Sequence, residues 1–192
     1  SNLKQQGLFV VMYSNDNADI IIPAKTQGLI PGGGEWHNNY ATLLGLQYGG
    51  NQYGMNTSFF ECPALGKRAS DQSWWWWRGY GFNGYSPTTD PEPRGLMKNV
   101  DAQYNGMTVS EPRSLQEVPN PSGVVAACDI IGNDICYYSV GSIVSPADGF
   151  TPGTRHSNGL NALYLDGHAE SHNKDYVDNK LTAWWGPFHY KY

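Results

Sequence analysis

From Phe59 onward this sequence shows no helical periodicity, and that feature constrains the fold more than any other. The segments that follow are short, of β type, and separated by links that contain Pro and Gly. We expect strands within 58–63, 73–85, 122–131, 134–144, 161–167 and 168–173. Short strands after an initial helical segment are typical of the α+β class, with the helix packed on an antiparallel sheet. We expect one domain over 1–192, with the sheet and its long decorated loops over 59–192.

The helical pattern covers residues 2–14. The residues near one stripe of this helix are Leu3, Gly7, Val10, Val11 and Ser14, with Leu8 and Met12 beside it. The run Asn15-Asp16-Asn17 is suited to ending a helix. A helix of this length is about 20 Å long and marginal in isolation. We therefore expect it to pack on the sheet or to continue upstream of Ser1. A second short helix is expected within 38–50.

Composition indicates an extracellular rather than a nucleic-acid-binding protein. The chain has 12 Lys and Arg against 17 Asp and Glu, a net charge of −5, so a phosphate-binding surface is not expected. Charged residues make up only 15% of the chain, whereas aromatic residues make up 14% and there are 23 Gly. No run approaches the ~20 apolar residues that span a bilayer. This balance favours a polar, loop-rich extracellular domain.

The three cysteines leave two interpretations open. Cys128 and Cys136 flank a Gly-Asn pair in CDIIGNDIC, and a hairpin there would bring them within disulfide range. The alternative is that both are reduced and buried. The extracellular composition favours the disulfide, which leaves Cys62 over, and we expect that residue to be buried.

A hairpin is the strongest local prediction in the chain. Asp166-Gly167 lies between two extended runs in LNALYLDGHAESH, and this pair is suited to a two-residue primed turn. His168, Glu170 and His172 are spaced by two and would share one face of the returning strand.

The same segment has a second interpretation, as a metal or acid–base site. It would be built from His156, Asp166, His168 and His172. His168 and His172 are four residues apart, which is about 13 Å on a flat strand, so they could bind one metal ion only if the strand bent. A catalytic pair of Asp129 and Asp166 across adjacent strands is a weaker alternative. We favour a structural role, with His156 bonded to a backbone carbonyl. Site chemistry needs converging groups that the sequence does not display.

Five motifs occur in an order that resembles a known family. The first is NLKQQGL followed by a Tyr and an Asn-Asp pair, and its matching residues are Asn2, Leu3, Lys4, Gln5, Gly7, Leu8, Tyr13, Asn15 and Asp16. The next three contribute Phe60, Cys62 and Pro63, then Tyr80, Gly81, Asn83 and Tyr85, then Pro121, Ser122 and Asp129. The last is His156 followed by nine residues and Asp166-Gly167. In these motifs the chain resembles the prepilin-type H-X9-DG proteins, which are type IV pilin-like pseudopilins.

The resemblance implies a structural subunit without catalytic activity or a required cofactor. In that family a leader and a long hydrophobic helix precede the soluble head, so residues 1–16 would be the C-terminal half of the pilin helix. The subunit would be anchored in the inner membrane with its head on the periplasmic or extracellular face. Its partners would be other pilin or pseudopilin subunits and components of a type II secretion or type IV pilus-like system. It would then assemble head-to-tail into a filament, through an interface that does not close.

Two binding functions are alternatives or additions. Trp74, Trp75, Trp76 and Trp77 lie in a segment outside the resemblance, as does 86–120, and exposed aromatic residues of this kind bind sugars or protein partners. Some pseudopilins carry a structural Ca²⁺, for which the candidate ligands here are Asp148, Asp175 and Asp178. Neither stretch has the density of oxygen ligands of a dedicated calcium loop.

Overall fold

The computed structural model describes residues 2–22, 62–65, 80–83, 96–104, 107–132, 135–136, 150–152 and 156–176. Its helices are α1 (Asn2–Asp16) and the short α4 (Lys174–Tyr176), with single 3₁₀ turns at Pro63–Leu65, Leu115–Glu117 and Pro121–Gly123. Its strands are β1 (Tyr80–Asn83), β2 (Met97–Tyr104), β3 (Met107–Pro112), β4 (Val125–Gly132), β5 (Ile135–Cys136), β6 (Phe150–Pro152), β7 (Gly159–Tyr164) and β8 (Ala169–Asn173). The helix expected within 38–50 lies outside the described residues.

Four of these strands form an antiparallel sheet in the order β1-β4-β7-β8. β6 pairs with the far end of β4, and β5 lies beside β1. The β1–β5 pair is parallel, which differs from the uniformly antiparallel sheet that the sequence predicts. The helix and the antiparallel sheet confirm the predicted α+β class.

The central strand β4 is buried on both faces of the sheet. Val125, Ala126, Ala127 and Cys128 are all fully buried, so both faces of this strand are covered. Continuous apolar runs are typical of strands covered on both faces, whereas alternation marks a strand with one face in water. Strand β7 is also buried at five of its six positions. These two strands therefore form the middle of the core.

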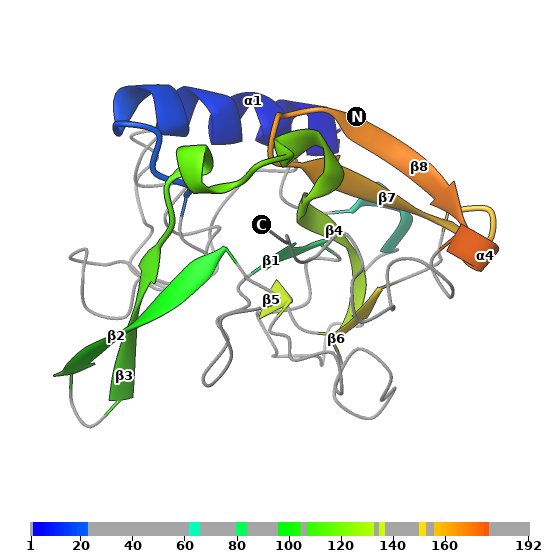
Figure 1. Ribbon diagram of the computed structural model, residues 1–192. Coiled ribbons are helices and arrows are strands. Elements are labelled where there is room, and N and C mark those ends of the chain that lie inside the picture. The colour runs from blue at the N-terminus through cyan, green and yellow to red at the C-terminus, as the bar shows by residue number, and fades with distance from the viewer. Residues whose placement is uncertain are drawn as a thin grey trace, which may run out of the picture.

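Helix α1 covers the sheet and contacts β7 and β8 (Figure 1). Of the predicted stripe, Leu3, Gly7, Val10 and Ser14 are buried and Val11 is partly buried. Gln6 is buried with them. On the outer side Leu8 and Met12 remain 59% and 48% exposed. The helix is thus held along one narrow stripe and keeps apolar side chains on its solvent face.

After α1 the chain turns back into the core. Asp19 donates its backbone N–H to the carbonyl of Ser14, and Ala18 and Asp19 both have positive φ. Ile21 and Ile22 then bury completely. The turn after the helix confirms the stop predicted at residues 15–17.

A second, two-stranded sheet is formed by β2 and β3. Figure 1 shows this hairpin extending away from the four-stranded sheet. It lies within the 86–120 segment, where the sequence analysis predicts no strand. A reason is that its eight-residue first strand, MKNVDAQY, mixes polar and apolar residues without regular alternation.

The predicted hairpin between Cys128 and Cys136 is wrong. Cys128 lies on β4 and Cys136 on β5, and β1 lies between these two strands. Adjacent strands are about 4.8 Å apart, so the two Cα atoms are separated by about two spacings, or 10 Å. Disulfides need Cα atoms within roughly 7 Å. The sheet order therefore gives the predicted disulfide no support.

Candidate functional site

The site is centred on Asp129, a carboxylate within the apolar strand β4. Its side chain is completely buried. A charged group in this position is costly unless it is paired. Oδ2 accepts hydrogen bonds from the backbone N–H and the side-chain Nδ2 of Asn161 on the neighbouring strand β7, at 2.7 and 3.1 Å. These two donors orient the carboxylate and leave its other oxygen, Oδ1, for a different partner.

That partner is His156, whose Nε2 lies 3.3 Å from Oδ1 of Asp129. The backbone of His156 exchanges two hydrogen bonds with Gly159 across Ser157 and Asn158, which both have positive φ. Positive φ at both central residues defines a type I′ hairpin turn. This turn places the imidazole beside β4. The predicted bond from His156 to a backbone carbonyl is made by its N–H, which donates to Gly159, whereas the ring contacts side chains.

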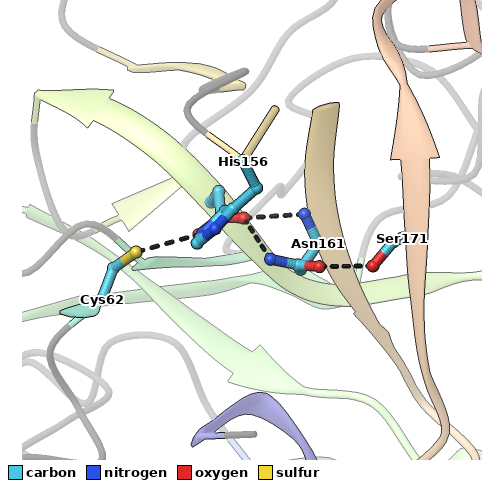
Figure 2. A network of polar contacts seen from close by, with 5 residues as sticks. Cys62, His156, Asn161 and Ser171 are labelled. Carbon is cyan, nitrogen blue, oxygen red and sulfur yellow. Dashed lines mark hydrogen bonds and ion pairs between the residues drawn. The ribbon is translucent and has the colours of Figure 1, made fainter. Parts of the chain in front are cut away.

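Cys62 contributes the third side chain and comes from a segment distant in sequence. It is buried, as expected, and immediately precedes the 3₁₀ turn that begins at Pro63. Its Sγ lies 3.3 Å from Nε2 of His156. Figure 2 shows Cys62 on one side of His156 and Asn161 on the other, with Ser171 beyond and bonded to Asn161. Cys62, Asp129 and His156 are called the Cys–Asp–His cluster below.

A cysteine, a histidine and an aspartate can form a nucleophilic triad, but this geometry does not match one. In a triad the base accepts the nucleophile's proton on one ring nitrogen and is oriented by the acid through the other. Here Sγ of Cys62 and Oδ1 of Asp129 both approach Nε2 of His156. The cluster instead brings three potential ligand atoms together, all within 4.8 Å of one another.

Asp166, Gly167 and His168 lie at the opposite end of strand β7, so the predicted four-residue metal or acid–base site is not formed. The N–H of Leu165 donates to Val124, whereas Asp129 is five residues further along β4, or about 17 Å. The predicted meeting of Asp129 with Asp166 is therefore wrong. Asp166 accepts from the backbone N–H of His168 at 3.1 Å and also contacts its ring.

The turn in this hairpin also differs from the two-residue primed turn that the sequence predicts. The N–H of Gly167 donates to the carbonyl of Tyr164, so Leu165 and Asp166 are the central residues of the turn. Only Gly167 has positive φ, at 89°. This is a three-residue loop, and its reason is Leu165, which is buried and bonded to Val124.

Tyr164 contacts both His168 and His172, and Glu170 lies 3.9 Å from His172, as the predicted shared face of these three residues requires. His168 stacks on Tyr164 at 4.3 Å between ring centroids, and His172 stacks on Tyr176 at 3.9 Å. The Tyr164 hydroxyl lies 2.7 Å from Nε2 of His172. Burial raises the pKa of Tyr164 far above its usual range, and burial lowers the pKa of His172. A protonated phenol and a neutral imidazole therefore share this hydrogen bond.

The remaining predicted residues give no site among the described residues. Trp74–Trp77, Asp148 and Asp178 lie outside them, so the aromatic binding surface and two of the three calcium ligands stay predictions. Asp175 is exposed on α4.

The contacts of Cys62 and Asp129 with His156 are not predicted from the sequence, although each residue belongs to one of the quoted motifs. The available signal was Asp129 itself, since a carboxylate inside VVAACDII requires a buried partner. Comparison of the chain with protein-family models, with curated proteins and with solved structures finds no match. The site is therefore interpreted from its own chemistry.

Proposed function

We propose that this chain is the globular head of a type IV pilin-like subunit, a pseudopilin, and that it is a structural protein rather than an enzyme. The fold would then be pilin-like, with α1 as the C-terminal half of the pilin helix. The observation that carries the proposal is the close packing of α1 on the sheet, where Gly7 contacts the turn at Gly167 with no side chain between them.

Contacts between the quoted motifs support this proposal. Gly7 of the first motif touches Gly167 of the last, 160 residues further along the chain. Asn83 of the third donates to the carbonyl of Val125 at 2.9 Å, inside the core. Motif residues that hold distant segments together are what a structural subunit requires, because its function is to present a fixed shape.

The two faces of α1 support an assembly function. One stripe is buried against β7 and β8, while Leu8 and Met12 are exposed and four residues apart. Residues four apart lie on the same side of a helix, so these two form a small apolar surface. In a filament this surface would pack against the helix of a neighbouring subunit through a heterologous interface.

The proposal requires an apolar segment of about 20 residues ahead of α1, to hold the subunit in the inner membrane before assembly. Among the described residues, no helix is both long and apolar enough to cross a membrane. The head would face the periplasm or the exterior, and its partners would be other pilin-like subunits and secretion-system components.

Cysteine crosslinking in cells that produce the full-length protein tests the proposal. Leu8→Cys and Met12→Cys should give a ladder of covalent oligomers after mild oxidation. Glu170→Cys is a matched control, because this side chain is 59% exposed but lies on β8, away from the outer face of α1. Monomers alone at positions 8 and 12, from protein found entirely in the soluble fraction, would contradict the proposal.

A further inference from the structure

The Cys–Asp–His cluster has a geometry that hydrogen bonds do not explain well. Nε2 of His156 lies 3.3 Å from both Sγ of Cys62 and Oδ1 of Asp129. A ring nitrogen either carries one proton or accepts one. If Nε2 accepts the thiol proton, its lone pair faces a carboxylate oxygen. If Nε2 carries the proton, a single hydrogen is shared between two acceptors.

A metal ion at the centre of the three atoms removes this conflict. Zinc binds thiolate sulfur at about 2.3 Å and imidazole nitrogen or carboxylate oxygen at about 2.0–2.1 Å, so tetrahedral ligand atoms lie roughly 3.4–3.6 Å apart. The sulfur–nitrogen and nitrogen–oxygen separations here are both 3.3 Å. Two of the three separations therefore already match tetrahedral zinc, and all three ligand atoms lie within 4.8 Å of one another.

Charge and ligand chemistry also favour zinc. A Cys62 thiolate and the Asp129 carboxylate together carry two negative charges, which would neutralise a divalent cation in a buried site. Thiolate combined with imidazole selects zinc over calcium or magnesium, which prefer oxygen ligands.

A supporting shell is already in place around the carboxylate. Asn161 holds Oδ2 of Asp129 with two donors, and Ser171 Oγ donates to Asn161 Oδ1 at 2.6 Å. Hydrogen bonds of this kind orient metal ligands and contribute to affinity. They leave Oδ1 directed toward the cluster.

We propose that Cys62, Asp129 and His156 form a zinc site that joins three separate segments of the fold. The His156 side chain is 29% exposed, so the site can be reached from solvent. Three protein ligands leave a fourth position for water or another donor. The site fastens the Cys62 segment and the His156 turn to the central strand β4. This proposal is independent of the assembly function proposed above.

Metal titration of the reduced, metal-free full chain tests the inference, with Zn²⁺ and with Co²⁺ as a spectroscopic probe. One equivalent of zinc should bind and raise the midpoint of thermal unfolding. Cobalt should produce a cobalt–thiolate charge-transfer band in the near ultraviolet, which zinc then displaces. Absence of both the band and the zinc-dependent shift in the wild-type protein would overturn the proposal without any variant.

Variants then assign the ligands. Cys62→Ser should abolish the cobalt–thiolate band. Asp129→Asn and His156→Gln should each weaken zinc binding by more than Asn161→Ala does. Asn161→Ala, which keeps all three ligands, should weaken binding about 10- to 100-fold. His168→Gln is the matched control and should bind as the wild type does, because His168 lies at the other end of β7. A full-strength thiolate band in folded Cys62→Ser would refute the assignment.

Discussion

The backbone carbonyl of Gly167 lies directly against the Cα of Gly7, so the turn of the β7–β8 hairpin touches α1 with no side chain between them. A Cβ at position 7 would collide with that carbonyl and lie 2.8 Å from Cδ1 of Leu163. The carbonyl belongs to the backbone and cannot rotate away as a side chain would. The orientation of the helix on the sheet therefore depends on glycine at position 7.

Replacing Gly7 with alanine should destabilise the protein despite the higher helix propensity of alanine. We expect a loss of about 1–3 kcal/mol in the free energy of unfolding, as for overpacked cores, measured by urea denaturation. Gln5→Ala, at an exposed position of the same helix, should change stability by no more than about 0.5 kcal/mol. A Gly7→Ala protein as stable as the wild type would show that α1 is seated differently.

Stability should decrease as the pH falls below about 6.5, the ordinary pKa of histidine, because of His172. Burial lowers the pKa of His172, and Glu170, 3.9 Å away, only partly opposes this shift. In this pH range the unfolded chain binds the proton more readily than the folded one, so acid favours unfolding.

Urea denaturation at pH 7.5 and 5.5 measures this pH dependence. His172→Gln keeps an acceptor for Tyr164 but does not titrate, so its loss of stability between the two pH values should be smaller than that of the wild type. An identical pH dependence in His172→Gln and the wild type would exclude His172 as the cause.

Ser157→Gly should stabilise the turn that positions His156. Ser157 has φ of 51°, and a left-handed conformation costs a non-glycine residue about 1–2 kcal/mol. Glycine loses more backbone entropy on folding, so we expect a net gain of about 0.5 kcal/mol by thermal or urea unfolding. Gly159→Ala should do the opposite, because its Cβ would lie 2.5 Å from the carbonyl oxygen of His172. A destabilised Ser157→Gly protein would argue against the type I′ turn.

Asn161→Asp should be more destabilising than Asn161→Ala. The alanine variant loses one side-chain hydrogen bond to the buried Asp129, worth about 1.5–3 kcal/mol for a charged acceptor. The aspartate variant also places a second carboxylate beside Asp129, which adds repulsion. Ser171→Ala removes only the outer bond and should cost about 1 kcal/mol or less. Equal stabilities at pH 7.5 for the two Asn161 variants would argue against the contact between the side chains of residues 161 and 129.

Local patterns allowed much of the fold to be predicted from sequence. The stripe of Leu3, Gly7, Val10 and Ser14 is a property of one helix, and the β7–β8 hairpin lies within 15 residues. The length of the loop in that hairpin depended on the core, because Leu165 is buried and its N–H donates to Val124, next to β4. The β2–β3 hairpin has no such local pattern.

The Cys–Asp–His cluster could not be predicted in the same way. Asp129 is 27 residues and Cys62 is 94 residues from His156 in sequence. Their meeting depends on the strand order β5-β1-β4-β7, which also places β1 between Cys128 on β4 and Cys136 on β5. Their spacing in the sequence suggested a site that contains both His156 and Asp166, whereas the sheet separates these residues by the length of β7.

Immunoelectron microscopy of cells that produce the tagged full-length protein tests the proposed function most directly. We expect the label along thin surface filaments, and sheared filament fractions should contain the protein, with a membrane-bound pool remaining in the cells. Gly7→Val, which should displace α1 from the sheet, should reduce the filament label. The cobalt–thiolate band of the purified variant serves as a separate readout of the Cys–Asp–His cluster. Protein found only as a free soluble monomer, with no labelled filaments and no membrane-bound pool, would contradict the account.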